Sequence, residues 1–256
     1  MITVGIDVGS ITTKAAVIRD GEILSTKVIM TGYNAQKAGE NVCEGILSEL
    51  EFQSSSIECV VATGYGRNSV TFSERVVTEI TCHATGAHYL NPKIRTIIDI
   101  GGQDSKAMII DARGSVKDFV MNDKCAAGSG RFLEVIARAL EVDLKDFCDL
   151  SILADNPAAI SNICTVFAES EVISFLSKGA QREDIIAGIH ESVAARIASM
   201  ANRIGLKAPI MMTGGVAKNK GLVKAVENKI GESIEVSKYA QVTGAIGVAL
   251  IGMISK

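Results

Sequence analysis

Apolar residues recur along this chain with two different spacings. Short runs rich in Val, Ile and Thr and bounded by Gly or Asp are typical of β-strands, whereas apolar residues spaced by three and four are typical of helices. By these patterns, strands are predicted at residues 3–7, 14–19, 22–31, 59–63, 96–100, 107–111, 119–121 and 210–213. Helices are predicted at residues 38–51, 76–90, 130–140, 166–178, 185–204, 220–230 and 243–254. This mixture of strands and helices predicts an α/β fold.

The chain also repeats itself. GIDVGSITTKAAVI at residues 5–18 is answered by IIDIGGQDSKAMII at residues 97–110, so that Asp7 aligns with Asp99 and Lys14 with Lys106. VATGY at residues 61–65 and MMTGG at residues 211–215 match in the same order. Such ordered repeats indicate an internal duplication. We expect two lobes with a cleft between them: residues 1–91, joined by the C-terminal helix at 243–256, and residues 92–242.

Composition narrows the function classes. Of the 256 residues, 47% are hydrophobic, which is enough for a large core, and the net charge is −3 with no run of like charges. Trp is absent and aromatic residues make up 4%, which argues against a nucleic-acid partner. Residues 242–254 form the longest apolar stretch, which is too short to span a bilayer. Because Met1 leads directly into a strand, we predict a cytoplasmic protein with no membrane partner. In such a protein the six cysteines are reduced thiols or metal ligands.

The turn after each repeated strand has the composition of a phosphate-binding loop. Glycine allows close approach of a polyphosphate, and the following backbone N–H groups, hydroxyls and lysine supply donors. Either turn alone is equally compatible with an ordinary β-turn, and the duplication is what favours a nucleotide. The residues predicted to bind ATP are Gly9, Ser10, Ile11, Thr12, Thr13 and Lys14, then Gly101 and Gly102, and finally Gly214 and Gly215.

Three polar residues in these turns are candidates for hydrolysis. Asp7 or Asp104 is predicted to organise Mg²⁺, and Gln103 is predicted to orient the attacking water. The P-loop sequence of Walker-type ATPases does not occur in the chain. The constellation resembles instead the actin, heat-shock chaperone and sugar-kinase superfamily. That resemblance implies a duplicated actin-like (ribonuclease H-like) ATPase fold with a nucleotide cleft.

Two cysteines stand directly before predicted helices, where the helix N-terminus stabilises a thiolate. They are Cys125 in NDKCAAG (residues 122–128) and Cys164 in CTVFAESEVI (residues 164–173). Two isolated cysteines are more often simply buried than ligands. If they are ligands, two of the four needed by a cluster come from each chain, so that a two-fold dimer is the economical solution. Glu169 and Glu171, which follow Cys164, either sense the nucleotide or cap the start of its helix, and the cap is favoured because acidic residues are common in a first turn.

The cysteine strings resemble those of the activator ATPases of 2-hydroxyacyl-CoA dehydratases, the BadF/BadG/BcrA/BcrD type. This family also includes the ATPase subunits related to benzoyl-CoA reductase. ATGYGRN (62–68), DIGGQD (99–104) and DIIAGIH (184–190) match as well. The resemblance implies a homodimer with one bridging 4Fe-4S cluster on Cys125 and Cys164, and a nucleotide contact at Gln241. It also implies ATP-dependent transfer of one electron from ferredoxin or flavodoxin to an iron–sulfur dehydratase or reductase.

Other functions are also compatible with parts of the sequence. Residues 32–39 lack the Gly/Thr-rich loop of dehydratase activators, so the partner could instead be a double-cubane-cluster or benzoyl-CoA-type reductase. A small-molecule kinase of the same superfamily would need an acceptor pocket with a catalytic Asp. An iron-free actin-like assembly or regulatory module would polymerise or bind a partner in response to nucleotide. Iron content after oxygen-free purification separates the electron-transfer hypothesis from the other two.

Overall fold

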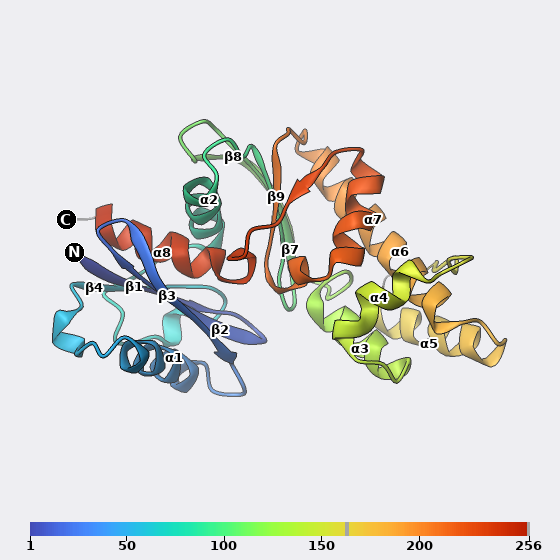
Figure 1. The fold of residues 1–256 in the computed structure, drawn as a ribbon, viewed down its shortest axis with the longest axis horizontal. Helices are drawn as coiled ribbons and strands as arrows, with labels where there is room; N and C mark the ends of the chain where they lie inside the picture. Colours follow the sequence, from blue (N-terminus) through green and yellow to red (C-terminus); the bar gives the residue numbers. More distant parts are fainter. Residues whose placement is uncertain (162–163, 255–256) are drawn as a thin grey trace. The chain divides into compact units, whose positions relative to one another are not determined.

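The computed structural model of the protein describes residues 1–161 and 164–254, which form an α/β structure with two five-stranded sheets (Figure 1). The strands are β1 (Ile2–Val8), β2 (Thr12–Arg19), β3 (Glu22–Met30), β4 (Cys59–Thr63), β5 (Arg75–Val76), β6 (Thr96–Ile100), β7 (Ser105–Ile110), β8 (Val116–Asn122), β9 (Ile210–Thr213) and β10 (Ile234–Glu235). The helices are α1 (Ala35–Glu49), α2 (Glu79–Leu90), α3 (Gly130–Ala139), α4 (Phe147–Ile152), α5 (Thr165–Ser177), α6 (Arg182–Arg203), α7 (Lys220–Ile230) and α8 (Thr243–Ile254).

The chain divides into two compact units. The first comprises Met1–Ile97, Ile110–Lys117 and Ser237–Lys256, and the second comprises Ile98–Ile109 and Asp118–Val236. The C-terminal helix α8 therefore belongs to the same unit as the N-terminal strands. Each unit has its own layers, and each is described separately below.

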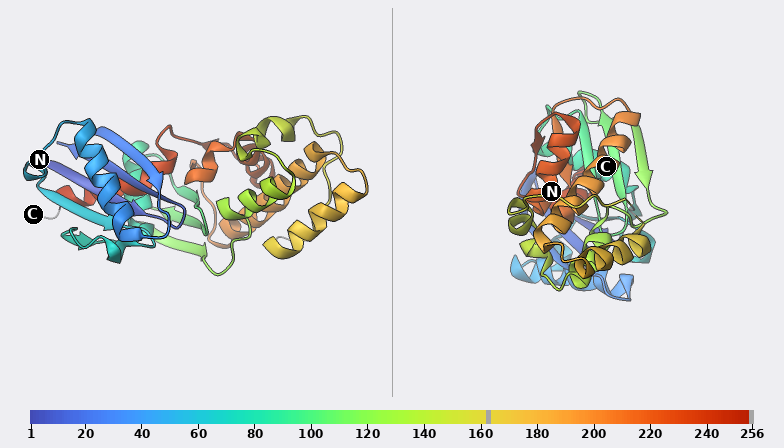
Figure 2. Two further views of the ribbon diagram at one scale, coloured as in Figure 1. Left: turned by 90° about the horizontal axis from the view of Figure 1, so that it is seen from below. Right: turned by 90° about the vertical axis from the view of Figure 1, so that its right-hand side faces the viewer.

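The first sheet has the strand order β3-β2-β1-β4-β5, with β1 antiparallel to β2 and parallel to β4. Successive side chains of a strand point to opposite faces of a sheet. On β2, Ala15 and Val17 accordingly pack in the core with α1, whereas Ala16 and Ile18 pack with α8. Helix α1 lies across its face of the sheet in the left view of Figure 2. The sheet is thus covered on both faces.

Helix α8 is apolar on all sides, as expected of a fully buried helix. Two glycines allow its close packing, because a methyl group on either would collide with a neighbouring backbone carbonyl. Gly5 of β1 lies against the carbonyl of Ala245, and Gly247 of α8 lies against the carbonyl of Cys82 on α2. None of the described helices is both long and apolar enough to cross a membrane.

The second sheet has the strand order β10-β9-β6-β7-β8. Read from the opposite edge, this order is β8-β7-β6-β9-β10. If β6–β10 are counted as strands one to five, the order is 3-2-1-4-5, which is also the order of the first sheet. The two halves therefore share one topology, which confirms the predicted duplicated actin-like fold. In the second unit, the 22-residue α6 packs against α4, α5 and α7.

Some short elements differ from the sequence prediction. Residues 76–90 were predicted as one helix, but Arg75 and Val76 pair with β4 as a two-residue strand and the helix begins at Glu79. The strand β10 and the one-and-a-half-turn helix α4 were not predicted. Elements this short carry too few residues to show a period. Tertiary pairing, and not local pattern, decides their structure.

Candidate functional site

Asp7 is a buried carboxylate at the end of β1. In the sheet it lies opposite Lys14 of β2 on one side and Thr63 of β4 on the other. The Nζ atom of Lys14 is 3.3 Å from Oδ2 of Asp7. Because Asp7 is only 5% exposed, its negative charge needs such a partner. This ion pair fixes the carboxylate at the edge of the sheet, beside the first predicted phosphate turn.

The first turn, between β1 and β2, is closed by short-range hydrogen bonds. The backbone N–H of Gly9 donates to the carbonyl of Thr12 at 3.1 Å. The hydroxyl of Thr31 donates to the carbonyl of Gly9 at 2.8 Å and lies 2.9 Å from the hydroxyl of Thr13. These contacts hold the turn in one shape and leave Ser10 exposed at its tip. A tight turn with an exposed hydroxyl is suited to an approaching phosphate group.

The second turn, between β6 and β7, contains a charged triad. The Nζ atom of Lys106 lies 3.2 Å from Oδ2 of Asp99 and 2.9 Å from Oδ2 of Asp104. The side chains of Lys106 and Asp99 are each 2% exposed, and that of Asp104 is 24% exposed. The N–H of Gly101 donates to the carbonyl of Asp104 at 3.0 Å. Gln103 is exposed at the tip, as Ser10 is in the first turn.

The two halves also match after the strands β4 and β9, which lie next to β1 and β6 in their sheets. Gly64, after β4, has φ +89°, and Gly214, after β9, has φ +88°, a conformation that favours glycine. A methyl group on Gly64 would collide with Oδ1 of Asp7, and one on Gly214 would collide with the carbonyl of Ile100. The hydroxyl of Thr213 donates to Oδ1 of Asp99 at 2.7 Å. Each half therefore presents a carboxylate with a lysine beside it and a glycine turn against it.

Several of these residues were aligned in the sequence but given no role. Asp99 and Lys106 occupy the positions of Asp7 and Lys14, and Thr213 occupies that of Thr63. The alignment of the two repeats could therefore have identified these three residues as part of the site. What the sequence could not show is that Lys106 contacts two carboxylates, because that depends on the path of the turn.

The remaining nucleotide-binding predictions fall at two places. Gly214 and Gly215 begin the 3₁₀ turn Gly215–Lys218 after β9, in the second unit. Gln241 lies in the 3₁₀ turn Ala240–Val242 that leads into α8, in the first unit. As predicted, the Gly214–Gly215 turn precedes a helix, which is α7, and Gln241 precedes the final helix, α8.

All six cysteines are free thiols, and they fall into two classes. Cys43, Cys59 and Cys82 are buried in the first unit. Burial raises the pKa of Cys43 to about 11 and, with a smaller contribution from the charge of Asp7, that of Cys82 to about 12. A thiol must lose its proton to bind a metal, so Cys43 and Cys82 are poor ligands. The accessible class is confined to the second unit and consists of Cys125, Cys148 and Cys164.

Cys125 lies in the loop between β8 and α3, which we call the Cys125 loop (residues 123–129). The side-chain amide of Asn122 donates to the carbonyl of Cys125 at 2.8 Å, and Ser129 donates to the carbonyl of Ala126 at 2.6 Å. Directly after this loop, the N–H groups of Gly130 and Arg131 donate to the carbonyls of Gly101 and Gly102 at 2.9 and 2.7 Å. The start of α3, directly after the Cys125 loop, is thus joined by backbone hydrogen bonds to the second predicted phosphate turn.

Cys164 is the exposed N-cap residue of α5, and its carbonyl accepts the N–H of Ala168 at 2.8 Å. The expectation that Glu171 caps this helix was wrong. Its carboxylate instead accepts hydrogen bonds from the N–H and hydroxyl of Ser161, at 3.0 and 2.9 Å, upstream of the helix. A residue two turns into a helix cannot reach the free N–H groups at its start. Glu171 thus connects Ser161 to α5.

Comparisons with known proteins agree with this arrangement. The model of the BadF/BadG/BcrA/BcrD ATPase family matches residues 4–252. The chain belongs to this ATPase family. The activator of lactoyl-CoA dehydratase from Anaerotignum propionicum is 47% identical over 251 residues, which cover 98% of this chain and 96% of that protein. A subunit of benzoyl-CoA reductase from Thauera aromatica is 36% identical, over 98% and 93% of the two chains.

Solved structures of family members give the same result. The (R)-2-hydroxyglutaryl-CoA dehydratase component A of Acidaminococcus fermentans matches with a TM-score of 0.95 and 44% identity, over 98% of this chain and 97% of that one. The activator of 2-hydroxyisocaproyl-CoA dehydratase from Clostridium difficile, solved with bound ADPNP, matches with a TM-score of 0.94 and 43% identity, over 99% and 95%. The fold of the family therefore covers nearly the whole chain.

The chemistry of two of these thiols, Cys125 and Cys164, is that of iron–sulfur ligands. Among residues 1–161 and 164–254, no three His, Cys, Asp or Glu side chains gather as a metal site. Cys125 and Cys164 are nevertheless free and accessible, and both precede a helix in the same unit. Cys148, the other accessible thiol, lies within α4. One chain can thus offer two cysteines, half of the set for a four-iron cluster.

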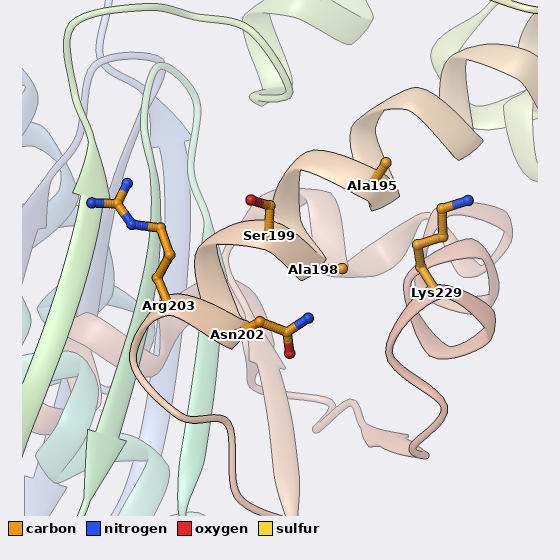
Figure 3. Close-up of a pocket in the computed structure, with 6 residues that line it drawn as sticks. All are labelled: Ala195, Ala198, Ser199, Asn202, Arg203 and Lys229. Atoms are coloured by element: carbon orange, nitrogen blue, oxygen red, sulfur yellow. The ribbon is translucent and has the colours of Figure 1, made fainter.

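A shallow groove on the second unit stands apart from these residues. It is lined by α6 and α7, through Ala195, Ala198, Ser199, Asn202, Arg203 and Lys229. Its two basic side chains, Arg203 and Lys229, extend away from each other in Figure 3. They do not converge on a common ligand, and the groove contains none of the predicted site residues.

Proposed function

We propose that this protein is an ATP-dependent one-electron donor that activates an iron–sulfur enzyme, with a 2-hydroxyacyl-CoA dehydratase as the favoured partner. The observation that supports this most directly is the hydrogen bonding between the second predicted phosphate turn and the start of α3, directly after the Cys125 loop. An ordinary kinase of this fold has no need for accessible cysteines next to its phosphate turn. The names of the lactoyl-CoA and 2-hydroxyisocaproyl-CoA dehydratase activators support the same activity.

In this proposal ATP binds to the duplicated turns. Backbone N–H groups and hydroxyls of the first turn contact phosphate, and Lys14 adds positive charge while it remains paired with Asp7. Asp7 or Asp104 organises Mg²⁺, and the exposed Gln103 orients the attacking water. The residues proposed to contact the nucleotide are Gly9, Ser10, Ile11, Thr12, Thr13, Lys14, Gly101, Gly102, Gly214, Gly215 and Gln241.

The link between ATP and the cysteines follows from the backbone. Gly130 and Arg131 form the first turn of α3, and their N–H groups are held by the carbonyls of Gly101 and Gly102. A phosphate-driven shift of the second turn therefore displaces the start of α3 together with the Cys125 loop. A discrete shift of a helix start is a common form of switching. ATP hydrolysis serves in this scheme as a gate, and no small substrate is modified.

Cys125 and Cys164 would hold a 4Fe-4S cluster together with the same two residues of a second copy of the chain. When bound, the cluster supplies one-electron chemistry at low potential. The surface next to Cys164 suits a second copy, because Phe167 and Ile173 of α5 are 62% and 55% exposed. Exposed large apolar side chains in one region are typical of an interface. Ferredoxin or flavodoxin would supply the electron.

Oxygen-free purification tests this proposal. The protein should be a brown homodimer with about two irons per chain after treatment with iron and sulfide. Cys125→Ala and Cys164→Ala should each lose most of the iron and keep ADP binding, whereas Cys148→Ala, the third accessible thiol, should keep both. A colourless, iron-free wild-type monomer would refute the proposal. So would unchanged iron in both ligand variants.

A benzoyl-CoA-type or double-cubane-cluster reductase is the second candidate partner. The similarity to the benzoyl-CoA reductase protein of Thauera aromatica favours it, as does the sequence of residues 32–39. Tyr33, in that segment, is fully exposed. The two partners are distinguished by mixing the reduced protein and ATP with each purified acceptor enzyme and measuring which one gains activity.

A further inference from the structure

Arg196 of α6 is a cation for which the described part of the chain offers no partner. Its Nε atom is buried and has no hydrogen-bond acceptor, and no ion pair of Arg196 is found among residues 1–161 and 164–254. Arg75 also has a buried, unbonded Nε, but its terminal nitrogen donates to the carbonyl of Ile251 at 3.0 Å. The guanidinium group is charged at every physiological pH. A buried donor without an acceptor is destabilising, so the unbonded Nε atom of Arg196 needs a reason.

The position of Arg196 supplies that reason. Val193 and Arg196, one helical turn apart on α6, both lie under Gly128 of the Cys125 loop. A methyl group on Gly128 would be 3.5 Å from Cγ1 of Val193 and 3.7 Å from Cδ of Arg196. Gly128 is buried and has φ +79°, so it lets the loop pass closely over the arginine stem. The stem of the half-buried Arg196 thus packs against the loop that carries Cys125, three residues before Gly128.

We propose that Arg196 is a positioning residue for the iron–sulfur cluster: its fixed positive charge compensates the negative charge that thiolates and cluster bring to the Cys125 loop. This inference rests on the proposed function. A cluster with thiolate ligands has a net negative charge, and charge near its sulfurs is one of the features that set its reduction potential. One-electron reduction adds a further negative charge, which a nearby cation favours. Arg196 therefore raises the potential relative to a neutral residue.

A phosphate group of the nucleotide is the competing anion, because the second phosphate turn adjoins the same loop through Gly130. The two sources give different results on substitution. If Arg196 serves the cluster, Arg196→Gln changes the redox properties and leaves ADP affinity unchanged. If it serves the nucleotide, the same variant weakens ADP binding and leaves the potential unchanged.

The experiment compares reconstituted dimers of the wild type, Arg196→Gln and Arg196→Lys. We expect Arg196→Gln to have a more negative midpoint potential in a dye-mediated titration followed by EPR, and Arg196→Lys to restore most of the wild-type value. Arg203→Gln is the matched control, since it removes an exposed arginine two turns further along α6 and should leave the potential unchanged. Thermal unfolding, iron content and ADP affinity are measured on every variant.

Each result bears on the inference. Loss of iron in Arg196→Gln but not in Arg196→Lys also supports it, because charge and not shape is then required. Equal potentials in wild type and Arg196→Gln overturn it. Weakened ADP binding with an unchanged potential overturns it as well, and so does loss of fold in both Arg196 variants. If the wild-type protein itself takes up no iron, the proposed function is refuted. This outcome differs from a failure of the Arg196 inference, in which the wild type binds iron and only the comparison with the variants fails.

Discussion

At the scale of single residues, two glycines share a backbone conformation but differ in their surroundings. Gly64 has φ +89° and Gly21 has φ +88°. A methyl group on Gly64 would collide with the carboxylate of Asp7, whereas one on Gly21 would meet no atom within 4 Å. Comparison of the two therefore separates the cost of the backbone conformation from the cost of crowding the site.

We predict that Gly21→Ala lowers the free energy of unfolding by about 1 kcal/mol, the cost of a left-handed alanine. Gly64→Ala should lower it by about 2–4 kcal/mol, because the overlap with Asp7 adds to that cost. ATPase activity should fall only in Gly64→Ala. Urea unfolding and a phosphate-release assay check both statements, and equal effects of the two substitutions would contradict the crowding at Asp7.

Lys106 allows a second prediction at this scale. It is 2% exposed and neutralises Asp99, which is equally buried. Lys106→Met removes the buried positive charge beside Asp99, and the hydrogen bond from Thr213 that remains does not neutralise the carboxylate. This loss should destabilise the protein by about 3–5 kcal/mol. Lys117→Met removes the exposed ion pair with Asp111 and should change stability little, because such pairs are solvated. Urea unfolding at pH 7 measures both variants, and a similar loss in each would argue against a special role of the buried pair.

The residues of the site were predictable in part. The repeat led to both turns, because the same residue types recur at the same spacing. The double contact of Lys106 and the bonds from Gly130 and Arg131 were not predictable, since they join segments that are separate in sequence. Arg196 has no signal at all in the sequence, because an unpaired cation is visible only when its neighbours are known.

At the scale of elements, His190 connects three helices of the second unit. It lies on α6, its ring is 6.1 Å from that of Phe147 on α4, and its Nε2 atom lies 3.0 Å from Nδ2 of Asn219, the N-cap residue of α7. The Oδ1 atom of Asn219 accepts the N–H of Leu222, so its amide nitrogen is the donor to His190. The ring must therefore be neutral. Burial accordingly lowers the pKa of His190 to about 4.

This pKa predicts how stability depends on pH. Between pH 6.5 and 4 the unfolded chain binds a proton at His190 and the folded chain does not, so stability rises with pH across this window and is lost as pH falls. From pH 7 to pH 5 the contribution is a loss of about 2 kcal/mol. His190→Gln should remove that part of the dependence. Urea unfolding of both proteins at pH 7 and 5 tests this, and parallel losses would show that other groups are responsible.

The length of an element decides whether the sequence pattern could predict it. Long elements such as α6 and β1 were predicted because several turns or alternations repeat in them. The α4 helix was missed, although it supplies Phe147 to the contact with His190. A six-residue helix has no room for two apolar turns, and its place depends on α6 and α7, with which it packs.

At the scale of the whole molecule, the duplication makes a prediction about nucleotide binding. Saturating ADP at one hundred times its Kd should stabilise the protein by about 2.7 kcal/mol. Gly9→Ala places a methyl group 2.8 Å from the carbonyl of Thr12, and Gly101→Ala places one 2.7 Å from Oδ1 of Asp104. Each variant should reduce the stabilisation by ADP, measured by thermal unfolding with and without nucleotide. Full stabilisation of either variant would exclude that turn from the site.

The packing of α8 has a consequence for biosynthesis. Residues 243–254 cover one face of a sheet made from the first strands of the chain, and Gly5 of β1 lies against Ala245. During translation, those strands leave the ribosome more than 200 residues before the helix that covers them. Until then Ala16, Ile18 and their neighbours stay open to solvent or to chaperones. The first unit therefore stays incomplete until α8 is made, and a premature stop that removes α8 would leave one face of its sheet uncovered.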